Sequence, residues 1–213
     1  MFVLVMAKEP VPGRVKTRLC PPCSPAQAAE IAAAALADTF DAACASGADE
    51  VIAALDGEPG PWLPSGVRVV PQVDETFDRR LAAAWAMTTG PGIQIGMDTP
   101  QVTVDDLDAA MATLADDAHD AVLGPAADGG WWAIGLPNAD ERVFLDVPMS
   151  TDHTGRDQRA RLESLGLRVG TLPEFVDVDH FAEALAVADL ATNSQFARAV
   201  RRVGDDATTA AAR

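Results

Sequence analysis

Phe2-Val-Leu-Val-Met6, followed by Lys8-Glu-Pro-Val-Pro-Gly13-Arg14-Val-Lys16-Thr17-Arg18, is the stretch of sequence that decides the fold. Its first part is a short apolar run, typical of a buried β-strand. Its second part holds four of the 16 Lys and Arg residues of a 213-residue chain that has 32 Asp and Glu residues and a net charge of −16. Cations concentrated against the overall charge indicate that an anion is held there, and phosphate is the first candidate.

Short apolar runs alternate with helical patterns along the rest of the chain, which predicts an α/β fold with a mostly parallel sheet. A Ser at N-cap, a Pro at the first helical position and a Gln three residues after the cap mark the start of the first helix at Ser24. Strands are expected over residues 2–6, 51–55, 67–71, 93–97, 121–124, 131–136 and 167–172, and helices over 25–46, 76–88, from 103, over 154–165 and after 179.

Length and composition bound the remaining possibilities. With 48% apolar and 23% charged residues the chain is globular, and its length suits one domain, expected over residues 1–203 with a frayed tail at 204–213. No apolar run approaches the ~18–20 residues of a membrane span. The start lacks the basic region of a signal peptide, so a cytoplasmic protein is expected. The acidic balance argues against nucleic-acid partners.

The basic loop lies where open α/β sheets bind ligands, between a strand and a helix. Two prolines and Gly13 fix a turn, from which Arg14, Lys16 and Arg18 can converge on phosphate oxygens. The loop is not a Walker A motif, because Lys16 follows Val15 and no Gly-Lys-Ser/Thr is present. A solvated basic loop is the alternative interpretation.

Three later segments carry carboxylates that could complete such a site. Asp98, in Gly96-Met-Asp-Thr-Pro100, directly follows a core strand and is a natural Mg²⁺ ligand beside phosphate, although a turn or N-cap aspartate reads the same way. Asp177 and Asp179, two apart on an extended segment, point the same way, unless Asp179 is a helix N-cap. Asp128-Gly129-Gly130-Trp131-Trp132 permits close backbone approach to a ligand, but its turn chemistry favours a hairpin with its aromatic rings in the core.

Two weaker signals remain. Cys20 and Cys23 have the spacing of a redox pair, but they lie in a loop remote from any strand and from the three histidines, so free thiols are the favoured interpretation. Ser150-Thr151-Asp152-His153-Thr154 could line a pocket or lead into a helix N-cap, and His153 is a weak general-base candidate.

Together, the segments resemble a bacterial glycosyltransferase-like family of unknown function with the GT-A, or nucleotide-diphospho-sugar transferase, fold. The resemblance rests on Lys8 to Leu19, Gly96 to Pro100, Gly124 to Leu136 and Asp177 to Asp179. The fold is also similar to that of 2-phospho-lactate guanylyltransferase and molybdenum cofactor guanylyltransferase. It implies a single domain of three αβα layers.

The resemblance also implies a role for each segment. Lys16, Arg18 and Asp98 would be catalytic, and Mg²⁺ or Mn²⁺ would be held by Asp98, Asp177 and Asp179. The nucleotide and its phosphates would be held by Lys8, Gly13, Arg14, Lys16, Thr17 and Arg18. The acceptor side would be shaped by Asp128, Gly129, Gly130, Trp131, Trp132, Ser150 and Thr151.

A metal-dependent, nucleotide-using transferase is therefore expected, with a nucleotide-sugar donor and a small-molecule acceptor. Nucleotidyl transfer from a nucleoside triphosphate to a phosphorylated acceptor, with release of pyrophosphate, is the first alternative. A nucleotide-binding module without turnover is the second. Whether the protein forms a homodimer is left open.

Overall fold

The computed structural model describes the backbone of residues 1–211 and the side chains of residues 1–204. A seven-stranded sheet in the order β3-β2-β1-β4-β6-β5-β7 forms its centre. The strands are β1 (Phe2–Lys8), β2 (Glu50–Asp56), β3 (Arg68–Pro71), β4 (Gly92–Ile95), β5 (Ala121–Pro125), β6 (Trp131–Leu136) and β7 (Val169–Thr171). Only β6 runs antiparallel to its neighbours, so the predicted mostly parallel sheet is confirmed.

Alternating side chains of the central strand β1 enter two separate apolar cores. Val3 and Val5 pack on one face with helices α1 and α3, whereas Phe2 and Leu4 pack on the other with α2 and α4. The helices are α1 (Pro25–Ala45), α2 (Phe77–Ala86), α3 (Val104–Ala115), α4 (Thr154–Ser164), α5 (Phe181–Leu190) and α6 (Gln195–Ala211), with short 3₁₀ helices η1 (Thr17–Leu19) and η2 (Glu141–Val143). The three-layer αβα arrangement is confirmed.

Local signals place the helix starts where the sequence predicts them. Ser24 caps α1 in a complete capping box with Gln27, and Thr103 caps α3 in the same way with Asp106. Each box satisfies amide groups that the first helical turn leaves without a partner. Helix α1 therefore begins at a fixed distance after β1, which sets the span of the basic loop between them.

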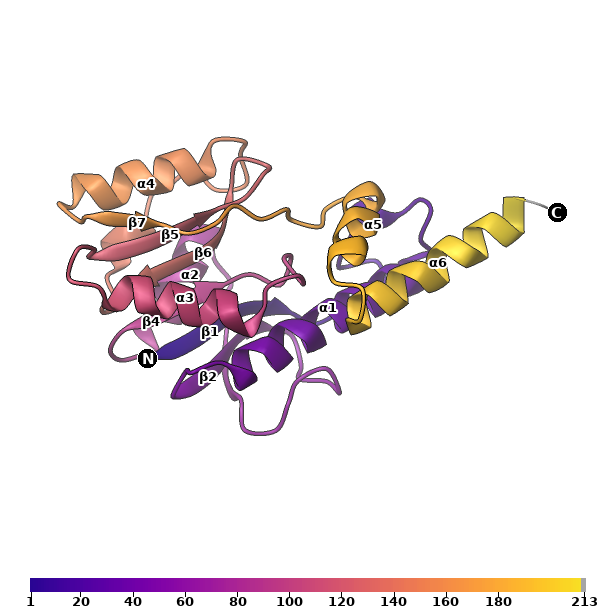
Figure 1. Cartoon of the computed structure of the whole chain (residues 1–213), viewed down its shortest axis with the longest axis horizontal. Helices are drawn as coiled ribbons and strands as arrows, with labels where there is room; N and C mark the ends of the chain where they lie inside the picture. Colours follow the sequence, from indigo (N-terminus) through magenta and orange to yellow (C-terminus); the bar gives the residue numbers. More distant parts are fainter. Residues whose placement is uncertain (212–213) are drawn as a thin grey trace.

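The C-terminal part differs from the expectation of one helical region. Helices α5 and α6 form a pair that packs on the outer side of α1, away from the sheet, through a third apolar cluster (Figure 1). An extended segment, residues 172–180, connects β7 to α5 across the sheet edge. The backbone continues as α6 to Ala211, and residues 212–213 lie outside the described residues, so fraying of the tail stays a prediction.

No helix in the described part of the chain is both long enough and apolar enough to cross a membrane.

Candidate functional site

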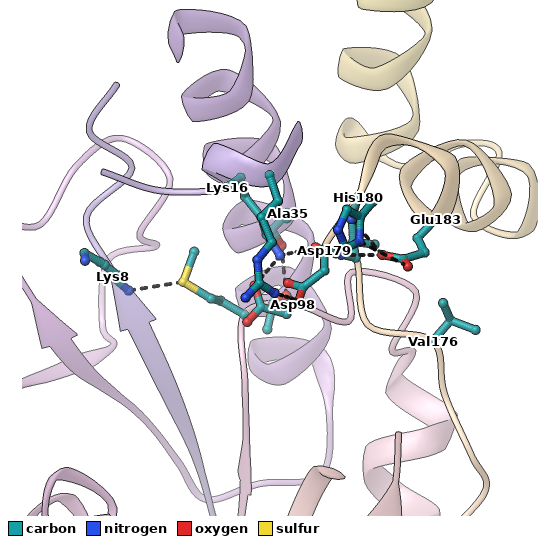
Figure 2. A network of polar contacts seen from close by, with 12 residues as sticks. Lys8, Lys16, Ala35, Asp98, Val176, Asp179, His180 and Glu183 are labelled. Atoms are coloured by element: carbon teal, nitrogen blue, oxygen red, sulfur yellow. Dashed lines mark hydrogen bonds and ion pairs between the residues drawn. The ribbon is translucent and has the colours of Figure 1, made fainter. Parts of the chain in front are cut away.

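The basic loop, residues 9–24, leaves the carboxyl end of β1 and folds back over the edge of the sheet. Lys16 initiates η1 with a left-handed φ of 46°, and its side chain is only 7% exposed. Its ammonium group forms an ion pair with the Asp98 carboxylate and donates a hydrogen bond to the Val178 carbonyl oxygen (Figure 2). Three segments far apart in the sequence thus meet at one lysine.

Two further contacts attach the segment before α5 to the same place. The Val178 amide donates to the Asp98 carbonyl oxygen at 2.8 Å, and the Arg18 guanidinium contacts the Asp179 carboxylate at 2.6 Å. Asp98 lies just beyond β4, the neighbour of β1 in the sheet. The predicted convergence of the basic loop with Asp98 and Asp179 is therefore present in the structure (Figure 2).

A cavity of about 340 Å³ opens beneath the basic loop. Its wall includes two acidic side chains, Asp98 and Asp179, and most of its polar lining is cationic. The cationic lining residues are Lys8, Arg14, Lys16, Arg18 and Arg80. We call it the cationic cavity, and its charge suits a phosphorylated ligand.

The sequence indicated Arg80 only as part of a helix. Its Nε donates to Gln72 Oε1 at 2.7 Å, and the Gln72 amide nitrogen donates to the carbonyl oxygens of Ala7 and Ala54 at 2.9 and 2.7 Å. Asp56 lies 3.5 Å from the Arg80 guanidinium and 3.8 Å from Lys8 Nζ. The ends of β1 and β2 thus hold Arg80 at the cavity wall. In the sequence, the one indication of this role is that Arg80 is an arginine within a predicted helix of a chain that has few cations.

A second cavity, of about 630 Å³, adjoins the first and shares with it the side chains of Asp98, Asp179 and Arg18. Six carboxylates line it: Asp98, Asp128, Asp152, Asp177, Asp179 and Glu183. Ser150, Thr151 and Trp131 also line it, and their place on an acceptor side stays a prediction. We call it the acidic cavity.

Two loops that form one wall of the acidic cavity approach each other through glycines. The Gly155 amide donates to the Gly129 carbonyl oxygen at 2.8 Å. A Cβ at Gly129, whose φ is +90°, would lie 1.9 Å from the Asp152 carbonyl oxygen, and one at Gly155 would lie 2.3 Å from the Gly130 carbonyl oxygen. Since real Cβ atoms do not come so close, both positions require glycine.

The two tryptophans after Asp128 have different environments. Trp132 is buried, stacks on Phe175 with ring centroids 4.5 Å apart, and donates from its indole nitrogen to the Pro173 carbonyl oxygen. Trp131 is half-buried and faces the acidic cavity. The β5–β6 pairing confirms the hairpin, but the expectation that both rings lie in the core holds for Trp132 and is wrong for Trp131.

Asp177 has the most perturbed carboxyl group of the site. Burial, reinforced by the nearby carboxylates of Asp98 and Asp128, raises its pKa to about 7 even though Lys16 acts in the opposite direction. Its Oδ1 is buried and has no hydrogen-bond partner within the described part of the chain. A carboxylate crowded by like charges and left with a bare oxygen fits a cation ligand.

The metal set predicted from the sequence is only partly supported by this geometry. Among the described residues no three Asp, Glu, His or Cys side chains are grouped to enclose a metal ion. Mg²⁺ nevertheless takes one or two carboxylates together with substrate phosphates, which Asp98 and Asp177 can supply. Asp179 is turned to Arg18 instead.

Three secondary expectations are wrong. Asp179 does not cap α5, because His180 is the N-cap residue and the Glu183 carboxylate accepts from the Asp179 and His180 amides. The helical spacing of Phe77 with Leu81 and Trp85 predicts that it faces the core, but it is 42% exposed and lines both cavities. His153 lines neither cavity, and its Nδ1 contacts Asp157 at 2.8 Å.

The remaining predicted residues take supporting positions. Thr17 lines the cationic cavity, whereas Gly13 lies outside the lining and supplies a positive φ of 78° to the turn. Cys20 and Cys23 are free thiols. Burial and the neighbouring Cys20 raise the pKa of the Cys23 thiol to about 11, which keeps it protonated and disfavours redox chemistry.

Sheet order, layers and the two cavities together define the nucleotide-diphospho-sugar transferase fold. Among the solved structures that share it are the three that follow. A protein from Desulfovibrio desulfuricans G20, assigned provisionally as a nucleotide-diphospho-sugar transferase, is 22% identical with a TM-score of 0.83 over 97% of this chain and 95% of its own. The likeness at this level of identity establishes the fold.

Two other structures of the same fold were solved with ligands. CMP:2-keto-3-deoxy-manno-octonic acid synthetase complexed with CTP is 14% identical, with a TM-score of 0.56 over 90% of this chain and 98% of its own. The manganese complex of Rv0371c from Mycobacterium tuberculosis H37Rv is 19% identical, with a TM-score of 0.52 over 87% and 97%.

Residues 27–151 match the model of a family described as "Uncharacterized protein conserved in bacteria (DUF2064)", and the chain belongs to that family. The family resemblance inferred from the motifs is thereby confirmed. A search of curated proteins gives no match.

Proposed function

We propose that the protein is a transferase that binds a nucleotide diphosphate-sugar donor together with Mg²⁺ or Mn²⁺ and transfers the sugar to a small acceptor. The observation that carries this proposal is the junction of the two cavities. A cationic cavity and an acidic cavity of about 340 and 630 Å³ meet at one wall that contains Asp98, Asp179 and Arg18. A donor phosphate on one side would then face an acceptor on the other.

The cationic cavity is the place for the donor diphosphate. Lys8, Arg14 and Arg80 surround it, and Lys16 and Arg18 stand at its border with the acidic cavity. Negative charge develops on the leaving nucleoside diphosphate as the bond to the sugar breaks. Cations that the fold already holds in place stabilise that charge with little reorganisation. Lys16 and Arg18 are therefore the residues proposed to promote departure of the nucleoside diphosphate.

Asp98 and Asp177 are the residues proposed to hold the divalent cation. When bound, such a cation would neutralise phosphate charge and act as a Lewis acid. The bare, buried Oδ1 of Asp177 and the mutual repulsion of the two carboxylates support the assignment. In the structure, Lys16 supplies the positive charge next to Asp98.

A thermal-shift screen tests the donor proposal. Nucleotide sugars should raise the melting temperature in the presence of Mg²⁺ and less in its absence, and one of them should release a nucleoside diphosphate when an acceptor is added. Stabilisation without consumption of any donor would favour the non-catalytic nucleotide-binding module instead.

Nucleotidyl transfer is the second candidate, favoured by one observation. Five cationic side chains line a single cavity, and such a number suits the larger negative charge of a nucleoside triphosphate. The synthetase of the same fold that was solved with CTP supports this alternative. Release of pyrophosphate from a triphosphate panel would decide for it, and sugar transfer without pyrophosphate would decide against it.

A further inference from the structure

We propose that the acidic cavity takes an uncharged or amino-substituted polyol, such as a sugar, and rejects acceptors that carry phosphate or carboxylate. This inference rests on the proposed transferase function and names the class of its acceptor. It follows from the charge of the cavity, from one unsatisfied hydroxyl group and from an aromatic ring.

The charge of the cavity disfavours anions. Of its six lining carboxylates, Asp98 and Asp177 are the proposed cation ligands, and Asp179 is paired with Arg18. Within the described residues, Arg18 is the only lysine or arginine of the lining. A bound divalent cation would therefore leave the cavity negative, and an acceptor phosphate would meet repulsion from several sides.

Thr99 provides an observation independent of the charges. It lies next to Asp98, it is 2% exposed, and it lines the acidic cavity. Its Oγ1 has no hydrogen-bond partner in the part of the chain that the structure describes. A buried hydroxyl group without a partner is costly, and a ligand hydroxyl could satisfy it.

The rest of the lining offers the groups that bind sugars. Asp128 uses Oδ1 to accept from the Gly130 amide at 2.8 Å, and its exposed side chain lines the cavity. Asp152 is exposed at the cavity wall, and Trp131 presents a half-buried ring there. Carboxylate oxygens accept from hydroxyl or ammonium groups, and an aromatic face packs on a sugar ring or attracts an ammonium group.

Binding can be measured without turnover, so the inference and the proposed function can fail separately. The full chain is first saturated with Mg²⁺ and inorganic pyrophosphate, which occupy the cationic cavity and keep it from capturing a sugar phosphate. Saturation-transfer NMR then compares glucose, glucosamine and glucose 6-phosphate. Glucose and glucosamine should bind, and glucose 6-phosphate should bind at least about tenfold more weakly than glucose.

Two pairs of variants sharpen the test. Thr99→Val, which removes the hydroxyl group and keeps the side-chain shape, should weaken glucose binding about tenfold, and Thr99→Ser should retain it. Asp152→Lys should admit glucose 6-phosphate, whereas Asp189→Lys, an equal charge change on a residue that lines neither cavity, should not.

Preferential binding of glucose 6-phosphate by the unaltered protein would overturn the inference. So would equal glucose binding by the Val and Ser variants of Thr99, or the absence of binding by both glucose and glucosamine. Failure of pyrophosphate to bind would instead overturn the proposed function, and the three sugars would then be compared in the free protein.

Discussion

Lys16 joins three parts of the chain through one buried ammonium group. Its contacts with Asp98 and with the Val178 carbonyl oxygen connect the loop after β1, the end of β4 and the segment before α5. The sequence predicts that Lys16 is a cation that binds phosphate. The structure adds a role in the fold itself, because the Lys16 ammonium group compensates the charge of the Asp98 carboxylate.

Substitution of Lys16 by Ala should therefore affect both stability and binding. Removing one partner of a partly buried ion pair leaves Asp98 without its counter-charge, and since Asp98 is 45% exposed the loss should be about 1–2 kcal/mol in a urea titration. Pyrophosphate affinity should also fall, and it should depend less on salt concentration than the affinity of the unaltered protein does.

Arg14→Ala is the matched control for this substitution. Arg14 is exposed and lines the same cavity, so its loss should weaken pyrophosphate binding and leave the unfolding midpoint unchanged. Equal stability of the two variants would show that the Lys16 contacts contribute nothing to the fold.

Asp177 should make stability depend on pH. Its pKa in the folded protein, about 7, lies above the ordinary value of 3.8, so the folded state binds the proton more tightly. The stability that this proton provides is complete below pH about 4 and is lost as the pH rises through 7. Because Asp177 is partly exposed, the free energy expected from its pKa shift is reduced. Asp177→Asn should therefore be more stable than the unaltered protein by about 2 kcal/mol at pH 8 and equally stable at pH 4.

Urea titrations of both proteins at pH 4, 6 and 8 measure this difference. Asp189→Asn serves as the control, because it makes the same change of side chain at an exposed residue that lines neither cavity. A constant difference between the Asp177 variant and the unaltered protein across the range would contradict the raised pKa.

At the scale of elements, two loops contact each other and together form one wall of the acidic cavity. The turn between β5 and β6 and the loop before α4 are in backbone contact through Gly129 and Gly155. Sequence reasoning treated the two segments separately, because nothing in either one reports its distance from the other. Only the sheet order, which places β6 beside β4, brings both of them to the Asp98 edge.

Gly129→Ala should separate these loops. The new Cβ would collide with the Asp152 carbonyl oxygen, and the positive φ adds strain, so the loss of stability should be about 3 kcal/mol. Gly90→Ala is the matched control, since its φ is +80° with nothing within 4 Å of the new Cβ, and it should cost only about 1 kcal/mol. Chemical denaturation of both variants, with glucose binding measured in parallel, tests the pair.

If Gly129→Ala and Gly90→Ala lost equal stability, the close approach of the loops would have no energetic importance. Glucose binding should fall in the first variant alone, because only the Gly129 substitution displaces Asp152, which lines the acidic cavity.

At the scale of the whole molecule, the sequence predicted the architecture well and the site in part. Strand and helix patterns depend on local periodicity and capping, which is why the sheet and its layers could be predicted. Arg80 and Gln72, which were missed, are held by contacts between distant segments. Thr99 was missed as well. No local signal marks a buried hydroxyl group that lacks a partner.

The whole molecule also explains how opposite charges come to share one edge of the sheet. The loop after β1 brings most of the cations, and the ends of β4, β5 and the segment after β7 bring most of the carboxylates. A diphosphate with a divalent cation is the ligand that would complement both sides at once. This is the central claim, and it makes the two ligands cooperative.

Isothermal titration of pyrophosphate with and without Mg²⁺, in the unaltered protein and in Asp98→Asn, tests that claim most directly. We predict that Mg²⁺ tightens pyrophosphate binding by about tenfold or more in the unaltered protein and by little in Asp98→Asn, because the variant loses a cation ligand. Pyrophosphate binding that is equally tight with and without Mg²⁺, or an undiminished Mg²⁺ effect in Asp98→Asn, would contradict it.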